Sequence, residues 1–167
     1  MTTPTLHVFL SHGLESGPGS TKIQAMKRAA ESFPGVTAIA IDHRSTKDPA
    51  ARLKQMDAAL KGSNADPERT VLAGSSMGGW VSLLMARRMP ERLAGLVTIA
   101  GAPDFTEDGY WATWSEDERA ELIAQGFRAL PSEYGEPMII TRRLIEDGRD
   151  RLVLRSALSL PMPVRML

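Results

Sequence analysis

The sequence has no cysteine and no excess of charge of either sign. Without cysteine among its 167 residues, the chain cannot form disulfides, thiolate metal sites or a cysteine nucleophile, and this composition is typical of a reducing compartment. The 20 basic side chains are balanced by 20 acidic ones, so the chain lacks the basic field that attracts nucleic acid or anionic lipid. We therefore expect a cytoplasmic protein that binds neither nucleic acid nor a membrane.

Long apolar runs are also absent. The chain has no stretch of about 18 consecutive apolar residues, and its first residues lack the basic and apolar segments of a signal peptide. With 43% hydrophobic and 24% charged residues, it has the composition of one globular domain, which we place at residues 1–167. No dinucleotide-binding glycine pattern follows a predicted strand, and we expect no cofactor.

Apolar segments alternate with segments of helical periodicity over the first hundred residues. Strands are predicted at 6–10, 36–41, 70–73 and 93–100, and helices at 20–33, 49–62 and 77–89, with Asp48 as the N-cap of the second helix. Strands and helices that alternate at this interval form parallel sheets through right-handed crossovers. The sequence therefore predicts an α/β fold, with a mostly parallel sheet covered by helices on both faces.

After Pro103 this alternation stops, and we expect residues 104–151 to form a small helical cap over the sheet. Ser115 and Glu118 have the spacing of a capping box at the start of one helix, and a second helix is predicted at 141–147. Four aromatic residues, at positions 105, 110, 111 and 114, either line a pocket for an acyl chain or form the core of the cap. Residues 161–167 have the pattern of the start of another strand.

One motif carries chemistry. Residues 74–78 read Gly-Ser-Ser-Met-Gly, a GxSxG pattern between the third predicted strand and the third predicted helix. Such a turn needs small residues on both sides, because the backbone is strained and Cβ atoms would collide with the neighbouring strand and helix. It presents Ser76 at a helix N-terminus, where unpaired N–H groups favour negative charge. Ser76 is the candidate nucleophile, and the N–H of Met77 is a candidate oxyanion-hole donor.

A second motif follows the first predicted strand directly. His12 and Gly13 match the loop that supplies the other oxyanion donor in such enzymes, here the N–H of Leu14. We interpret His12 itself as a structural residue of that loop. His43, in the loop after the second predicted strand, is expected to be solvated. A phosphate-binding loop is excluded for GLESGPGSTK, because Ser20 and Thr21 separate the last glycine from Lys22.

With these motifs in this order, the chain resembles the α/β-hydrolase superfamily. Within it, the chain is similar to the mitochondrial palmitoyl-protein thioesterases that also hydrolyse acyl glucuronides, and to their bacterial relatives. The resemblance rests on SHGLESGPGSTK, IDHRST, GSSMGGW, IAGAPDF and ITRRLIEDG. It implies a serine esterase or thioesterase with a helical cap, which hydrolyses a small acyl ester or thioester through an acyl-enzyme on Ser76 while the Leu14 and Met77 N–H groups hold the oxyanion.

The chain departs from this pattern in one respect. The triad of the superfamily runs in the order serine, acid, histidine, whereas His7, His12 and His43 all precede Ser76. We therefore expect a hydrolase chain that is truncated at its C-terminus, lacks the last strands and a helix, and is inactive in this form. Asp104 follows the fourth strand and is either a substitute acid or a loop aspartate. A non-catalytic protein that acts through partner binding is the alternative, and the oligomeric state stays open.

Overall fold

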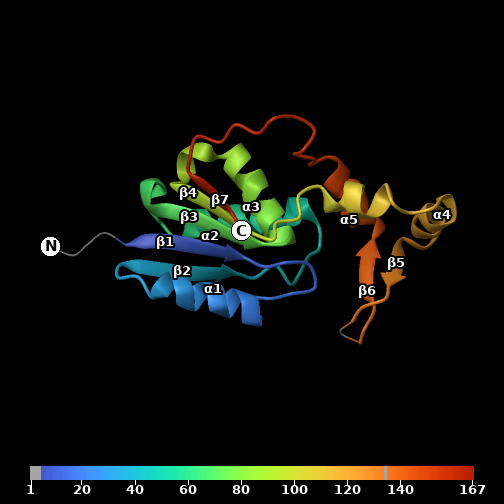
Figure 1. The fold of residues 1–167 in the computed structure, drawn as a ribbon, viewed down its shortest axis with the longest axis horizontal. Coiled ribbons are helices and arrows are strands. Elements are labelled where there is room, and N and C mark those ends of the chain that lie inside the picture. The colour runs from blue at the N-terminus through green and yellow to red at the C-terminus, as the bar shows by residue number, and fades with distance from the viewer. Residues whose placement is uncertain (1–4, 134) are drawn as a thin grey trace.

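The computed structural model describes residues 5–133 and 135–167, and its centre is a sheet of five strands in the order β2-β1-β3-β4-β7 (Figure 1). All neighbouring strands are parallel, as the alternation of strands and helices predicts. The strands are β1 (Leu6–Ser11), β2 (Val36–Ile41), β3 (Thr70–Ser75), β4 (Gly95–Ile99) and β7 (Val164–Met166).

Helices cover both faces of this sheet, so the predicted fold class is confirmed. Successive strand residues point to opposite faces. Val8 packs in a cluster with Ile23 of α1 (Thr21–Glu31), whereas Phe9 packs in another with Met56 of α2 (Pro49–Gly62) and Met85 of α3 (Met77–Arg88). Two short 3-10 helices, η1 (Pro67–Arg69) and η2 (Pro90–Arg92), precede β3 and β4.

Between β4 and β7 the chain leaves the sheet. This segment contains a π-helix, η3 (Thr106–Trp111), then α4 (Glu116–Gln125), the antiparallel strands β5 (Phe127–Leu130) and β6 (Met138–Thr141), and α5 (Arg142–Arg149). Figure 1 shows α4, β5, β6 and α5 beyond the end of the sheet to which strands β1 and β2 point. Both sequence-predicted helices are present, and α4 begins with the predicted capping box. The β5–β6 hairpin and the π-helix were not predicted.

The aromatic residues of this segment pack on one another and on the main domain. The ring of Phe105 contacts those of Trp80 and Tyr110 edge to face, and Tyr110 stacks on Trp114. Trp80 is fully buried and Trp114 is nearly so. These contacts favour the interpretation of the cluster as a core over that of a pocket lining.

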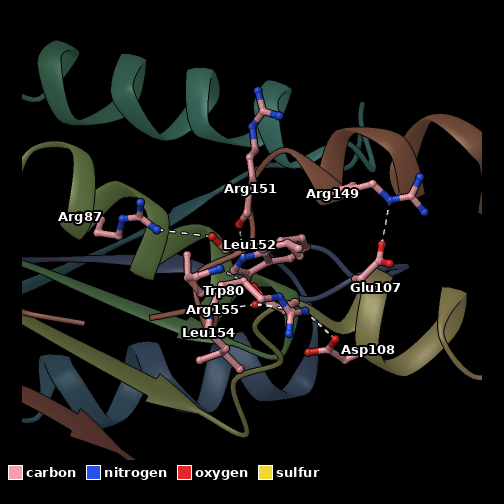
Figure 2. A network of polar contacts seen from close by, with 11 residues as sticks. Trp80, Arg87, Glu107, Asp108, Arg149, Arg151, Leu152, Leu154 and Arg155 are labelled. Carbon is pink, nitrogen blue, oxygen red and sulfur yellow. Dashed lines mark hydrogen bonds and ion pairs between the residues drawn. The ribbon is translucent and has the colours of Figure 1, made fainter. Parts of the chain in front are cut away.

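Polar contacts also hold the segment that follows α5 against α3 and η3 (Figure 2). The indole N–H of Trp80 donates to the carbonyl oxygen of Arg151 at 3.3 Å, and the Arg155 guanidinium forms an ion pair with Asp108 at 2.5 Å. Trp80 lies on the helix that follows the GxSxG turn. The buried Trp80 side chain therefore connects the helix after the serine turn to the segment after α5.

Helix α2 begins where predicted, with Asp48 at its N-cap position, but the predicted side-chain cap is not formed. The Asp48 side chain does not cap this helix; it forms an ion pair with Arg143 of α5 at 2.7 Å. Asp147 of α5 instead accepts a hydrogen bond from the N–H of Ala50, in the first turn of α2, at 2.7 Å. A cap from another part of the chain thus replaces the local one, because Asp48 has a cation within reach.

Candidate active site

Ser76 occupies a strained turn between β3 and α3. Its backbone has φ 54° and ψ −124°, a conformation that non-glycine residues rarely adopt, and its N–H donates to the carbonyl of Ile99 at 3.2 Å. The flanking glycines explain how this turn fits. A Cβ atom at Gly74 would overlap the backbone of Gly78, and one at Gly78 would overlap the carbonyl of Ser11. The local geometry is therefore the one that the GxSxG motif predicts.

The peptide between Ser76 and Met77 is fixed through its carbonyl. The Ser76 carbonyl oxygen accepts hydrogen bonds from the N–H groups of Gly79, Trp80 and Ala102 at 2.9, 3.3 and 3.1 Å. In a trans peptide the C=O and N–H point in opposite directions. The N–H of Met77 is therefore directed away from the helix and carries the positive end of its dipole.

A cavity of about 510 Å³ lies beside the serine. It is lined by Ser76 and Ser75, by residues 12–16 of the loop between β1 and α1, and by residues 20–23 at the start of α1. A Cβ atom built on Gly13 would lie 3.7 Å from the Ser76 hydroxyl oxygen. The structure thus brings Ser76 and the loop of Leu14 to one cavity.

His12 is buried and has no free ring nitrogen. Its Nδ1 can only donate to the carbonyl oxygen of Gly13, at 2.9 Å, and its Nε2 can only accept from the N–H of His43, also at 2.9 Å. The ring is therefore neutral, and burial lowers its pKa. This supports the structural role predicted for His12.

His43 was predicted to lie in a solvated loop, and this prediction is wrong. The side chain is fully buried, and its two ring nitrogens contact the Ser11 hydroxyl at 3.0 Å and the Gln55 side-chain oxygen at 2.7 Å. Burial lowers the pKa of His43 to about 4. Within the described residues, neither of these histidines has a nitrogen available to accept a proton from Ser76, and His7 lies at the opposite end of β1.

This burial predicts a pH dependence of stability. The unfolded chain binds a proton at His43 near its ordinary pKa of about 6.5, whereas the folded chain resists protonation until about pH 4. The free energy of unfolding should therefore fall by about 3 kcal/mol as the pH drops through this interval. Urea titrations at several pH values test this, with His43→Gln as the comparison. An equally steep decline in the His43→Gln variant would contradict the assignment.

Asp104 is fully buried, with a left-handed backbone of φ 58°. Its two carboxylate oxygens accept hydrogen bonds from the N–H groups of Val153 and Leu154, both at 2.8 Å. Both oxygens are therefore engaged in holding the segment that follows α5. This contact supports the interpretation of Asp104 as a loop aspartate.

Arg52 is a residue near the site that sequence analysis missed. It lies on the buried side of α2, where its guanidinium donates to the carbonyl oxygens of His12 and Gly13 at 3.0 and 3.2 Å. The signal in the sequence is its position four residues before Met56, on the apolar face of the helix.

Two features are absent from residues 5–133 and 135–167. In that part of the chain, no helix is both long and apolar enough to cross a bilayer. Nor do three or more histidine, aspartate or glutamate side chains gather there in an arrangement that could hold a metal ion.

Known proteins resemble this chain in both sequence and fold. A solved structure of a putative hydrolase from Agrobacterium vitis S4 is 34% identical, with a TM-score of 0.86 over 97% of this chain and 67% of that one. The mitochondrial palmitoyl-protein thioesterase ABHD10 of Mus musculus is 33% identical over 99 residues, 58% of this chain and 33% of that protein. The structure of mouse alpha/beta hydrolase domain-containing protein 10 is 23% identical, with a TM-score of 0.82 over 99% of this chain and 69% of that one.

These similarities establish the fold and the family. The chain spans about a third of the length of the curated thioesterase that it matches. Residues 7–111, which include the loop of Leu14 and the Ser76 turn, match a family described as Uncharacterised protein family (UPF0227). The chain therefore belongs to the UPF0227 family and has the α/β-hydrolase fold.

Proposed function

We propose that the protein is a serine hydrolase of carboxylic esters or thioesters, in which Ser76 forms the acyl-enzyme. The observation that carries this proposal is the strained Ser76 turn, which opens on the cavity that the loop of Leu14 also lines. Strain at a single serine that faces a cavity is typical of a nucleophile. The names of the mouse thioesterase and the bacterial hydrolase support the same class of reaction.

The proposed reaction has two halves. The Ser76 oxygen attacks the acyl carbonyl, its proton passes to a general base, and the alcohol or thiol departs with a proton. Water then attacks the acyl-enzyme, which releases the acid and restores the serine. The N–H groups of Leu14 and Met77 stabilise the oxyanion in both halves.

The general base of this proposal is not among the three histidines of residues 1–167. Two of them are fully hydrogen-bonded, and none follows Ser76 in the sequence. We therefore expect the 167-residue chain by itself to show no turnover of p-nitrophenyl butyrate. The protein expressed from its complete gene should turn it over.

A second cavity is suited to the acyl group. It has a volume of about 560 Å³ and lies between Leu14 and the turn of the β5–β6 hairpin. Its apolar lining is formed by Leu14, Pro131, Pro137 and Met138, and its polar lining by Ser132 and the glutamates at positions 15, 133 and 136. Leu14 and Glu15 line both cavities, so an acyl chain attached at Ser76 has apolar surface within reach. A small acyl ester or thioester is the substrate class that we propose.

Labelling with a fluorophosphonate probe tests the nucleophile. The protein expressed from its complete gene should label, and Ser76→Ala should abolish labelling. Ser82→Ala is the matched control, because this serine lies in α3, directly after the Ser76 turn, and its buried hydroxyl has no hydrogen-bond partner among the described residues. Labelling that survives in Ser76→Ala would remove Ser76 from the mechanism.

The alternative is a non-catalytic protein that acts through a partner, and the engagement of its histidines favours it. This alternative would be supported if the complete gene product showed no labelling and no turnover but formed a stoichiometric complex with a partner. A cytoplasmic location stays a prediction.

A further inference from the structure

The peptide between Gly13 and Leu14 is held from its carbonyl side. The Gly13 oxygen accepts two hydrogen bonds, from His12 Nδ1 at 2.9 Å and from Arg52 Nη1 at 3.2 Å. This peptide is trans, so its N–H, which belongs to Leu14, points away from both donors. The Leu14 N–H is the group that the proposed function uses at the oxyanion. Its direction is therefore set by what holds the Gly13 carbonyl.

Arg52 is an unusual donor for this position, because it is a buried cation without a carboxylate. Only 2% of its surface is exposed, and its hydrogen bonds go to the backbone oxygens of Thr46, His12 and Gly13. Within the described residues, no aspartate or glutamate lies within ion-pair distance of its guanidinium. Burial lowers the pKa of Arg52 only to about 10, so the group stays charged at neutral pH.

The buried charge is compensated by three carbonyl oxygens and, beyond ion-pair distance, by the Glu15 carboxylate, so it remains costly for the folded state. A neutral donor could hold the same carbonyls at lower cost, as His12 does at Gly13. A neutral donor lacks the positive charge of Arg52. This charge draws electron density toward the carbonyl oxygen of the peptide, and the N–H of the same peptide therefore becomes a stronger hydrogen-bond donor. This effect is largest where water is excluded.

We propose that Arg52 is a positioning residue of the oxyanion hole, which orients and polarises the Gly13–Leu14 peptide so that the Leu14 N–H binds the oxyanion more strongly than the ground-state carbonyl. The proposal rests on the proposed serine hydrolase function. Arg52 contacts no substrate in this role. Its contribution appears in the transition state, where negative charge develops on the acyl oxygen.

The test uses Arg52→Gln and Arg52→Lys in the protein expressed from its complete gene, with p-nitrophenyl butyrate as substrate. Loss of a whole oxyanion donor typically costs about 10²- to 10³-fold in kcat, so a weakened donor should cost about 10- to 100-fold in Arg52→Gln, with KM changed less than about threefold. Arg52→Lys keeps the charge and should lose less. Lys54→Gln, an exposed change on the same helix, should leave kcat unchanged.

A second measurement separates this role from a merely structural one. Butylboronic acid forms a tetrahedral adduct with a reactive serine, and one of its oxygens occupies the oxyanion hole. Its Ki should rise in Arg52→Gln by about the factor by which kcat falls, since both report the same hydrogen bond. All rates are divided by the folded fraction of each variant. If Arg52→Gln does not fold, the same comparison is made with Arg52→Lys.

The outcomes distinguish the two proposals. If the unmodified protein neither labels at Ser76 nor turns over substrate, the proposed function fails and the role of Arg52 falls with it. If the unmodified protein is active, and the folded Arg52 variants keep their kcat and their affinity for the boronic acid, only the role of Arg52 is overturned.

Discussion

Replacement of Gly78 by alanine is expected to destabilise the folded chain by more than about 3 kcal/mol. The new Cβ would overlap the carbonyl of Ser11 and approach that of His12. Both contacts are to backbone atoms, which cannot move aside as the end of a flexible side chain can. The end of β1 and the loop that follows it would have to separate from α3. Urea unfolding, followed by far-UV circular dichroism, measures the loss.

A matched glycine gives the control for this experiment. Gly62 is the last residue of α2, and a Cβ built on it meets no atom within 4 Å. Gly62→Ala should therefore leave stability unchanged or raise it by about 0.5–1 kcal/mol, because alanine loses less backbone entropy on folding. Equal effects of the two substitutions would show that the close approach at Gly78 has no energetic importance.

The second large loss of stability is expected when Asp104 is replaced. Asp104→Ala removes the acceptor for the Val153 and Leu154 N–H groups and places alanine at a positive φ. Hydrogen bonds to a charged acceptor contribute about 1.5–3 kcal/mol each, so the free energy of unfolding should fall by about 3–5 kcal/mol. Amide hydrogen exchange should also accelerate at residues 151–155, since these depend on the carboxylate.

Asp150→Ala is the comparison for this variant. Asp150 is exposed and directly follows α5, close in sequence to the anchored segment. Its substitution should change stability by less than about 0.5 kcal/mol. Asn at position 104 should fall between wild type and alanine, because its single amide oxygen replaces two carboxylate oxygens. A folded Asp104→Ala protein with wild-type stability and exchange rates would mean that these hydrogen bonds contribute nothing.

The parts of the fold that sequence analysis predicted depend on residues that lie close together in the sequence. The strand at 36–41 has the predicted bounds, and the capping box at Ser115 forms as its spacing requires. Alternating apolar segments determine which faces are buried, and cap residues determine where helices begin. The parallel order of the sheet follows from the same alternation.

The parts that failed depend on residues far away in the sequence. Asp48 occupies the predicted N-cap position, but its carboxylate pairs with Arg143 and makes no capping hydrogen bond. His43 is buried, and it forms hydrogen bonds with a hydroxyl of β1 and an amide of α2. No local pattern specifies such contacts. The β5–β6 hairpin was missed because its strands are four residues each, too short for their alternation to be distinguished from a loop.

The residues of the candidate site also fall into those with a local sequence signal and those that depend on distant contacts. Ser76, Leu14 and Met77 could be predicted as site residues because each belongs to a motif whose geometry the backbone fixes locally. Arg52 could not, because an arginine inside an apolar helical face is ordinarily a side chain that reaches solvent. Only the structure shows that its guanidinium turns inward to the carbonyls of residues 12 and 13.

The start of α2, about one helical turn from Asp48 to Arg52, contacts two regions of the chain. On one side, Asp48 and Ala50 are bonded to α5; on the other, Arg52 holds the Gly13 carbonyl. A helical turn is stiff, so a displacement of α5 is transmitted to the Gly13–Leu14 peptide. If the proposed hydrolase function holds, a compound that binds against α5 and shifts it would alter the reaction at Ser76, and by thermodynamic reciprocity a transition-state analogue at Ser76 would alter the affinity of that compound.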